Sequence, residues 1–139
     1  MSDLTTIHKQ SQPKGVVEIV TAESAISATN TPVAIPCVGA KNIGVVLTAA
    51  AINSRTGVLT ITVSPDGTNF YAYSMLISNL ANSNAQDLTR VASKSRAENG
   101  TDILWLTPET LGAIVAIKAK CTITGGTAGT FTVKAIINY

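Results

Sequence analysis

Apolar and polar residues alternate strictly in one central segment of the chain. Between residues 57 and 64, Leu59, Ile61 and Val63 are separated by Thr60 and Thr62. Successive side chains of a β-strand point to opposite faces, so this period of two predicts a strand with one buried face. No segment keeps an apolar period of 3.6 residues over ten or more positions, and we therefore expect no long helix.

A turn follows this strand, and a second strand follows the turn. Three successive residues favour this turn: Pro65 has a fixed φ, the Asp66 side chain can accept hydrogen bonds from nearby backbone, and Gly67 tolerates a positive φ. Residues 70–77 then form a new apolar and aromatic segment. The spacing predicts a β-hairpin with a loop of about five residues.

The C-terminal part of the chain repeats this pattern. Residues 113–124 and 130–138 each place aliphatic side chains on one face and lysines or threonines on the other. The glycine-rich segment 125–129 lies between them. We therefore predict a second hairpin, whose Lys and Thr face is either solvated or protected against edge-to-edge association.

The other apolar segments are short. They predict further strands at 16–21 and 43–49 and an edge strand or strand entry at 32–37, while 87–92 and 102–106 are short apolar pieces next to polar sequence. Thr107, Pro108 and Glu109 have the order typical of a helix start, and Gly112 limits such a helix to one turn.

Seven or eight strands with regularly spaced turns predict an all-β fold. We expect a single β-sandwich over residues 15–139, either jelly-roll or immunoglobulin-like in topology. A true immunoglobulin domain has Trp soon after its first Cys, whereas Trp105 here shortly precedes Cys121. Residues 1–14 are polar and aperiodic, and they predict a flexible N-terminal arm.

Composition narrows the possible partners. Of the 139 residues, 45% are hydrophobic, but only 4% are aromatic and only 13% are charged, about half the usual charged share. The net charge of +2 gives no basic field for nucleic acid. No apolar run reaches the roughly 18 residues needed to span a bilayer. We expect neither nucleic acid nor a membrane as a partner, and a surface poor in charge suits contact with other protein.

Candidate chemistry is scarce. His8 is the only histidine, and it lies in the predicted arm, where it cannot be held against a substrate. Cys37 and Cys121 are too few and too far apart in sequence to supply four zinc ligands, and Asp66 lacks the further ligands of a calcium loop. We therefore expect no enzyme, no metal and no cofactor. The cysteines are interpreted as small buried side chains, with a disulfide as the alternative.

A few large apolar side chains are candidates for contact with a partner. These interface candidates are Tyr71, Tyr73 and Trp105, together with Leu4 and Ile7 of the arm. Tyr71 and Tyr73 share one face of a predicted strand. Because Tyr and Trp are enriched at protein interfaces, we interpret them as interface or core residues. The alternative is a stacking platform for carbohydrate, which would also use Tyr139.

Two motifs resemble those of small virion proteins of tailed bacteriophages. One is the alternating strand followed by Ser64-x-Asp66-Gly67-Thr68-Asn69-Phe70, and the other is Gly126-Thr127-Ala128-Gly129-Thr130-Phe131-x-Val133. The resemblance covers residues 57–73 and 113–138, roughly half of the chain. It is carried by turns and strands, and the family has no catalytic residues to transfer.

The resemblance implies a capsid decoration or head-fibre protein. Such a chain is made in the host cytoplasm, assembles with itself, commonly as a trimer, and binds the major capsid protein on the outside of the head, so that it ends in the virion. Alternatives are a module that binds carbohydrate or a host surface, a neck or tail accessory subunit, and a coat subunit that forms its own shell. The last is disfavoured because the arm carries only Lys9 and Lys14 to neutralise packaged nucleic acid.

Overall fold

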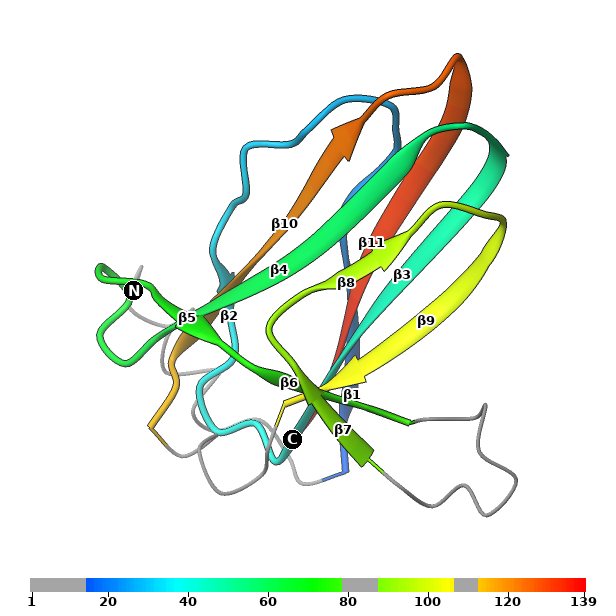
Figure 1. Cartoon of the computed structure of the whole chain (residues 1–139). Helices are drawn as coiled ribbons and strands as arrows, with labels where there is room; N and C mark the ends of the chain where they lie inside the picture. The colour runs from blue at the N-terminus through cyan, green and yellow to red at the C-terminus, as the bar shows by residue number, and fades with distance from the viewer. Residues whose placement is uncertain (1–14, 79–87, 107–112) are drawn as a thin grey trace.

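Two antiparallel sheets pack face to face as a sandwich, which confirms the predicted all-β class (Figure 1). The computed structural model describes residues 15–78, 88–106 and 113–139. The predicted arm, 1–14, and the predicted helical turn at 107–110 lie outside these ranges. The described residues include no helix long and apolar enough to cross a bilayer.

The described residues form eleven strands. They are β1 (Val17–Ile26), β2 (Ile35–Pro36), β3 (Asn42–Asn53), β4 (Thr56–Ser64), β5 (Tyr71–Tyr73), β6 (Met75–Ser78), β7 (Leu88–Val91), β8 (Lys94–Arg96), β9 (Gly100–Trp105), β10 (Ala116–Thr124) and β11 (Ala128–Asn138).

The order of the strands decides between the two topologies that the sequence leaves open. One sheet has the order β1-β11-β3-β9-β6-β7, and the other has the order β2-β10-β4-β5, with β8 also paired to β4. Successive strands alternate between the sheets from β1 to β4 and again from β8 to β11. In an immunoglobulin sandwich, strands A and B are neighbours within one sheet, as are F and G. The alternation observed here is that of a jelly roll.

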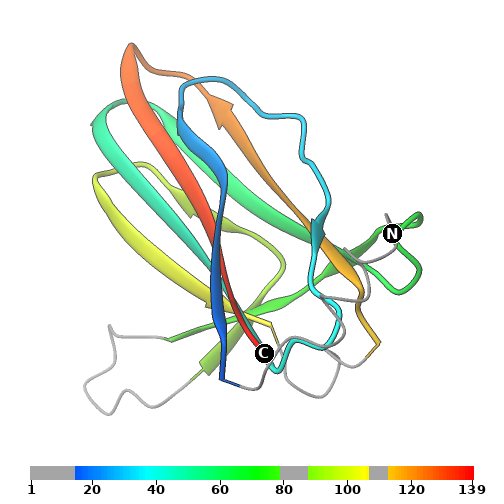
Figure 2. The same ribbon diagram turned by 180° about the vertical axis from the view of Figure 1, so that it is seen from behind.

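The predicted C-terminal hairpin is wrong in its pairing. The strands β10 and β11 are successive in sequence, but they belong to opposite sheets, and the chain crosses between the sheets at 125–127 (Figure 2). β11 instead pairs with β1 on one side and β3 on the other, while β10 pairs with β2 and β4. An alternating pattern shows that a strand has one buried face, but it does not specify the sheet.

The predicted strand at 70–77 is divided in the structure. β5 pairs with β4 in the five-stranded sheet, as the hairpin prediction requires. After Ser74 the chain enters the other sheet, where β6 pairs with β7 and β9. The apolar pattern continues across Ser74, so the pattern alone does not mark this change of sheet.

The inner faces of the two sheets supply the core. Side chains predicted to face inward on β4, Leu59 and Ile61, are 0% and 1% exposed. On β11, Phe131 and Val133 are fully buried, and the ring of Phe131 lies so close to Gly57 that a Cβ there would approach it to 2.6 Å. Burial of aliphatic and aromatic area on these faces is the main stabilising contribution to the fold.

The crossing after β10 depends on close backbone contact. Gly125 and Gly126 have φ angles of 70° and 71°, in the left-handed region that favours glycine. A Cβ at Gly126 would lie 2.5 Å from the backbone nitrogen of Arg55, whereas a Cβ at Gly125 has its nearest neighbour, the carbonyl oxygen of Ser54, at 3.3 Å.

This pair of glycines separates backbone strain from steric exclusion. Gly125→Ala is expected to cost about 1–2 kcal/mol, because alanine adopts the left-handed conformation at a penalty and the Ser54 carbonyl oxygen, 3.3 Å from the new Cβ, has to move only slightly. Gly126→Ala is expected to cost about 1–3 kcal/mol more, because overpacking adds to the same penalty. Urea unfolding of the two variants measures the difference. Equal stabilities would contradict the close packing of residues 53–55 against Gly126.

Candidate interaction surface

The outward face of the five-stranded sheet is polar. Thr60 and Thr62 of β4 lie opposite Lys120 and Lys118 of β10 in the register of the sheet. The Lys118 ammonium also lies 4.2 Å from the centre of the Phe70 ring, a cation–π contact. This face has the Lys and Thr composition that the sequence predicts for a solvated surface.

The outward face of the six-stranded sheet is different. One cross-strand row runs through β1, β11, β3, β9 and β6, and its members are Ile19, Ile136, Gly44, Trp105 and Leu76. Ile19 is 64% exposed and Trp105 is 41% exposed. The row thus extends across five strands without a polar side chain, and on the sixth strand, β7, the exposed Arg90 lies opposite Leu76.

Trp105 lies over the backbone of the neighbouring strand. A Cβ at Gly44 would lie 2.7 Å from Cζ3 of the Trp105 ring, so only glycine leaves room for the indole at this pair. Aromatic side chains cover cross-strand glycines in this way in other sheets. The contact holds the indole against the sheet while much of it remains open to solvent.

Residues next to this row extend the apolar area. Val46 and Ile103 pair across β3 and β9 beside Gly44 and Trp105, and Val17 lies two residues before Ile19 on β1. Ile103 is 43% exposed and Val17 is 53% exposed. We call the resulting surface the apolar face; it consists of Val17, Ile19, Gly44, Val46, Leu76, Ile103, Trp105 and Ile136.

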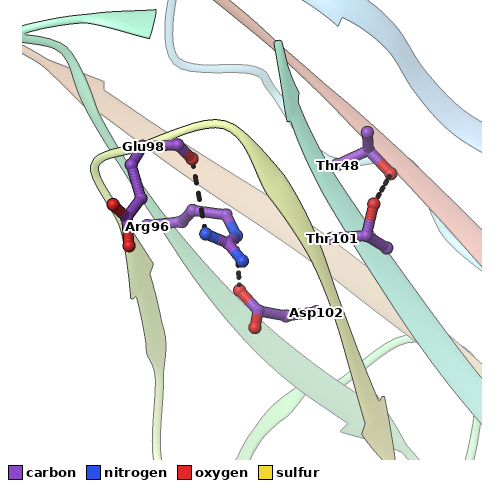
Figure 3. A network of polar contacts seen from close by, with 5 residues as sticks. All are labelled: Thr48, Arg96, Glu98, Thr101 and Asp102. Atoms are coloured by element: carbon purple, nitrogen blue, oxygen red, sulfur yellow. Dashed lines mark hydrogen bonds and ion pairs between the residues drawn. The ribbon is translucent and has the colours of Figure 1, made fainter.

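Beyond the apolar face the same sheet becomes polar. Thr132, Thr48 and Thr101 form the next row on β11, β3 and β9. The hydroxyl oxygens of Thr48 and Thr101 lie 3.2 Å apart and are hydrogen-bonded (Figure 3). Lys134 pairs with Val46 at the boundary. Among the described strand positions that point outward on this sheet, none carries a carboxylate.

The structure separates the interface candidates that the sequence groups together. Trp105 lies on the apolar face, whereas Tyr71 and Tyr73 pair with Val63 and Ile61 at the edge of the other sheet. Tyr71 is 59% exposed, and Tyr73 packs against the core. Leu4 and Ile7 lie outside the described residues.

Sequence reasoning missed most of the apolar face. Its members on β1, β9 and β11 occupy the positions between the core residues of the same strands. The sequence predicts strands at 16–21 and 130–138, but the pattern does not assign Val17, Ile19 or Ile136 to an outward face. The signal in the sequence is that these strands carry apolar residues at successive positions, and therefore on both of their faces. Only one face of the sheet is covered by the other sheet, so the second set of apolar residues points outward.

Tyr139 is not available as a stacking platform. It is 3% exposed, and its hydroxyl donates a hydrogen bond to Glu18 Oε1 at 3.2 Å. Burial, together with the Glu18 charge, raises the pKa of Tyr139 well above its ordinary value. Both residues lie at the open edge between the sheets, where Glu18 joins Val20 and Ile35 in lining a pocket of about 340 Å³.

An ion pair links the two sheets at the opposite end of the sandwich. Arg96 Nε of β8 lies 2.9 Å from Asp102 Oδ2 of β9, and both side chains are largely buried (Figure 3). The same guanidinium donates through Nη1 to the carbonyl oxygen of Glu98 and lies over Gly100. Arg96 belongs to the five-stranded sheet through β8 and Asp102 to the six-stranded sheet through β9, so this pair stabilises the crossing between the sheets.

In the turn after β4, the carboxylate of Asp66 finds its hydrogen-bond donors within the turn itself. Asp66 Oδ1 accepts hydrogen bonds from the Ser64 hydroxyl and from the backbone N–H groups of Thr68 and Asn69, and Oδ2 accepts one from the Asn69 amide. The Asn69 and Thr68 N–H groups in particular hold the pKa of Asp66 well below its usual range. The described residues contain no cluster of three or more His, Cys, Asp or Glu side chains that could hold a metal ion.

Both cysteines are free and fully buried, in agreement with the favoured interpretation. Burial raises the pKa of the Cys37 thiol to about 12. Burial and the nearby Glu23 carboxylate raise that of Cys121 to about 11. Because the thiolate is the reactive form, these side chains act as small apolar core residues.

Comparison with known proteins identifies a shared fold. The SPBc2 prophage-derived protein YomS superimposes with a TM-score of 0.61 over 91% of this chain and 96% of its own length, at 10% sequence identity. A structure of infectious bursal disease virus, Gx strain, aligns with a TM-score of 0.43 over 90% of this chain and 32% of the viral chain, at 15% identity. No family model matches the sequence, and no curated protein matches it. The first similarity is close enough to establish a common fold.

We expect the native thiols to resist modification. Ellman's reagent should label neither Cys37 nor Cys121 over minutes at pH 8 and should label both once the protein is unfolded, because each thiol is buried and protonated in the folded state. Absorbance at the released chromophore measures the labelling. Rapid labelling of the native protein would contradict the enclosed positions of these side chains.

Asp66 makes stability depend on pH. Its pKa is lower when folded than the value of about 3.9 when unfolded, so its contribution is complete above that value and is lost as pH falls below it. Asp66→Ala should melt below the wild type at pH 7, and the gap in Tm should narrow between pH 4 and pH 2. Asp66→Asn, which keeps one acceptor oxygen, is the matched control and should lie between the two at pH 7. A gap that does not change with pH would show that the charge has no part in the turn.

Proposed function

We propose that this chain is a structural protein of a phage particle and that it decorates the outer surface of the head as an oligomer. The observation that carries the proposal is the apolar face. A monomeric protein rarely exposes a contiguous apolar area of several hundred Å², and such areas mark contact sites. A head surface covered by many copies of one small protein supplies contacts of this kind in symmetric repetition.

The common fold with a prophage-derived protein supports the same proposal. The match extends over nearly the whole of both chains, so it concerns the complete sandwich rather than one hairpin. Fold alone does not determine function, and the argument for a structural role therefore rests on the surface. The two turn motifs that resemble those of phage virion proteins agree with the proposal, and in the structure they form the Asp66 turn and the Gly126 crossing.

The low charge of the chain agrees with burial against protein. Desolvation of an ion costs several kcal/mol unless a partner compensates it. The eight residues of the apolar face carry no ion, and the charged side chains that border it, Lys134 and Arg90, lie opposite Val46 and Leu76. A surface of this kind can be covered by a neighbour at little electrostatic cost.

A carbohydrate-binding module is the alternative, and the geometry gives it less support. A sugar platform needs aromatic side chains close enough to contact one ligand. Tyr71 lies at an edge of the five-stranded sheet, whereas Trp105 lies on the outward face of the six-stranded sheet. Each is exposed by itself, so we expect a glycan array probed with the purified chain to show no specific binding.

The direct test examines particles. Phage particles are purified on a density gradient from an induced culture of the strain that carries the gene, and in parallel from a strain in which the gene is deleted. We expect peptides of this chain in the first particles, in a fixed ratio to the major capsid protein, and re-binding of the purified chain to the heads of the second. Particles that contain none of the chain, or that bind it only on tails, would contradict a head-decoration role.

A further inference from the structure

We propose that the apolar face binds a protein surface of the phage head that is apolar at its centre and carries a carboxylate opposite Lys134. The inference deepens the proposed function and rests on it, because the head supplies the partner. It adds the chemistry of the partner surface and the side chain of this chain that selects it.

Lys134 lies directly beside the apolar row. The row next to the one that contains Trp105 consists of Thr21, Lys134, Val46 and Ile103. Lys134 and Ile136 are two residues apart on β11, so their side chains point to the same side and their Cα atoms lie about 7 Å apart. A partner that covers the apolar face therefore also meets the Lys134 side chain.

The charge of Lys134 is not compensated within the described part of the chain. Lys134 is exposed, and no carboxylate among the described residues forms an ion pair with it. An ammonium that a partner removes from water loses its hydration, and an opposite charge is needed to offset that loss. A carboxylate on the partner offsets it and also distinguishes the correct partner from others.

Arg90 gives the end of the apolar row the same sign of charge. It lies on β7, which is four strands from β11 in the sheet order, or about 19 Å at the usual spacing between strands. Its Nη1 donates a hydrogen bond to the Ser74 carbonyl oxygen at 3.0 Å, which holds the guanidinium at this end of the row. The apolar residues thus lie between two cationic positions, and an apolar surface with acidic borders is complementary to them.

These charges distinguish between three kinds of partner. A second copy of this face would bring another Lys134, and the described outward strand positions of its sheet would supply no carboxylate. An anionic lipid surface attracts clusters of several Lys and Arg side chains, whereas Lys134 and Arg90 are widely separated. Single carboxylates of a protein match this spacing better.

The test uses the whole purified chain, with heads from the deletion strain as the probe. Sedimentation with these heads measures the dissociation constant at low and at high NaCl concentration. The wild type should bind more weakly at high salt, and Lys134→Glu should raise the dissociation constant at low salt at least about 10-fold. Lys134→Arg keeps the charge and should bind within about threefold of the wild type.

Lys120→Glu is the matched control. Lys120 is also an exposed strand lysine, but it lies on the outward face of the other sheet, opposite Thr60. Both Glu variants change the net charge equally, and both should keep the circular dichroism spectrum and Tm of the wild type. If Lys134→Glu does not fold, Lys134→Met replaces it, because it removes the charge and keeps the apolar stem; its binding should depend less on salt than that of the wild type.

A carbodiimide provides a second readout on the complex of chain and heads. This reagent joins an ammonium to a carboxylate in direct contact with it through an amide bond, with loss of water. We expect mass spectrometry to identify a peptide in which Lys134 is joined to an Asp or Glu of a head protein. Lys134→Arg should bind the heads without giving this peptide.

The outcomes separate this inference from the proposed function. Equal binding of heads by Lys134→Glu and Lys120→Glu, or cross-linking of Lys134 only to a second copy of this chain, would overturn the inference and leave head decoration intact. Sedimentation with phosphatidylglycerol vesicles that is lost in Trp105→Ser would assign the face to lipid and would also overturn it. If the wild type binds no heads, the proposed function fails, and this inference fails with it.

Discussion

The pleat of the β-strand is the constraint on which this structure depends. Each strand has two faces, and the sandwich buries one face of every long strand between its sheets. The outward faces must then be solvated or covered by other protein. In this chain the two outward faces have different compositions: one displays Thr and Lys around Thr60 and Lys120, and the other displays an apolar row through Ile19, Gly44 and Trp105.

The jelly-roll topology determines which strands share a face. Val17 and Ile19 come from the beginning of the described chain, Ile136 from its end, and Trp105 from its middle. Because β11 pairs with both β1 and β3, and β3 pairs with β9, these distant segments lie side by side. The crossing at Gly126 and the Arg96–Asp102 pair hold the second sheet against the back of this surface and leave its outward side open.

Much of the fold was predictable from sequence, because alternation reports burial directly. The inward residues of β4, β10 and β11 agree with the period of two, and the turn at Asp66 agrees with its residue types. The pairing of β10 and β11 was not predictable in this way, since local pattern does not record which sheet a strand joins. For the same reason Lys118 and Lys134, predicted on one face, lie on opposite sides of the sandwich. Trp105 was predicted from the sequence as an interface candidate. Its neighbours on the apolar face can be identified only when the order of the strands is known.

Trp105 is the only tryptophan of the chain and lies in the middle of the apolar face, so its fluorescence reports directly on the central claim that this face is covered by protein. The decisive measurement is quenching of Trp105 by acrylamide, in the free chain and in the chain bound to heads that lack it, with the signal of the heads alone subtracted. The account predicts efficient quenching in the free chain, since the side chain is then 41% exposed, and strong protection in the bound chain. Quenching that is equally efficient in both would contradict it.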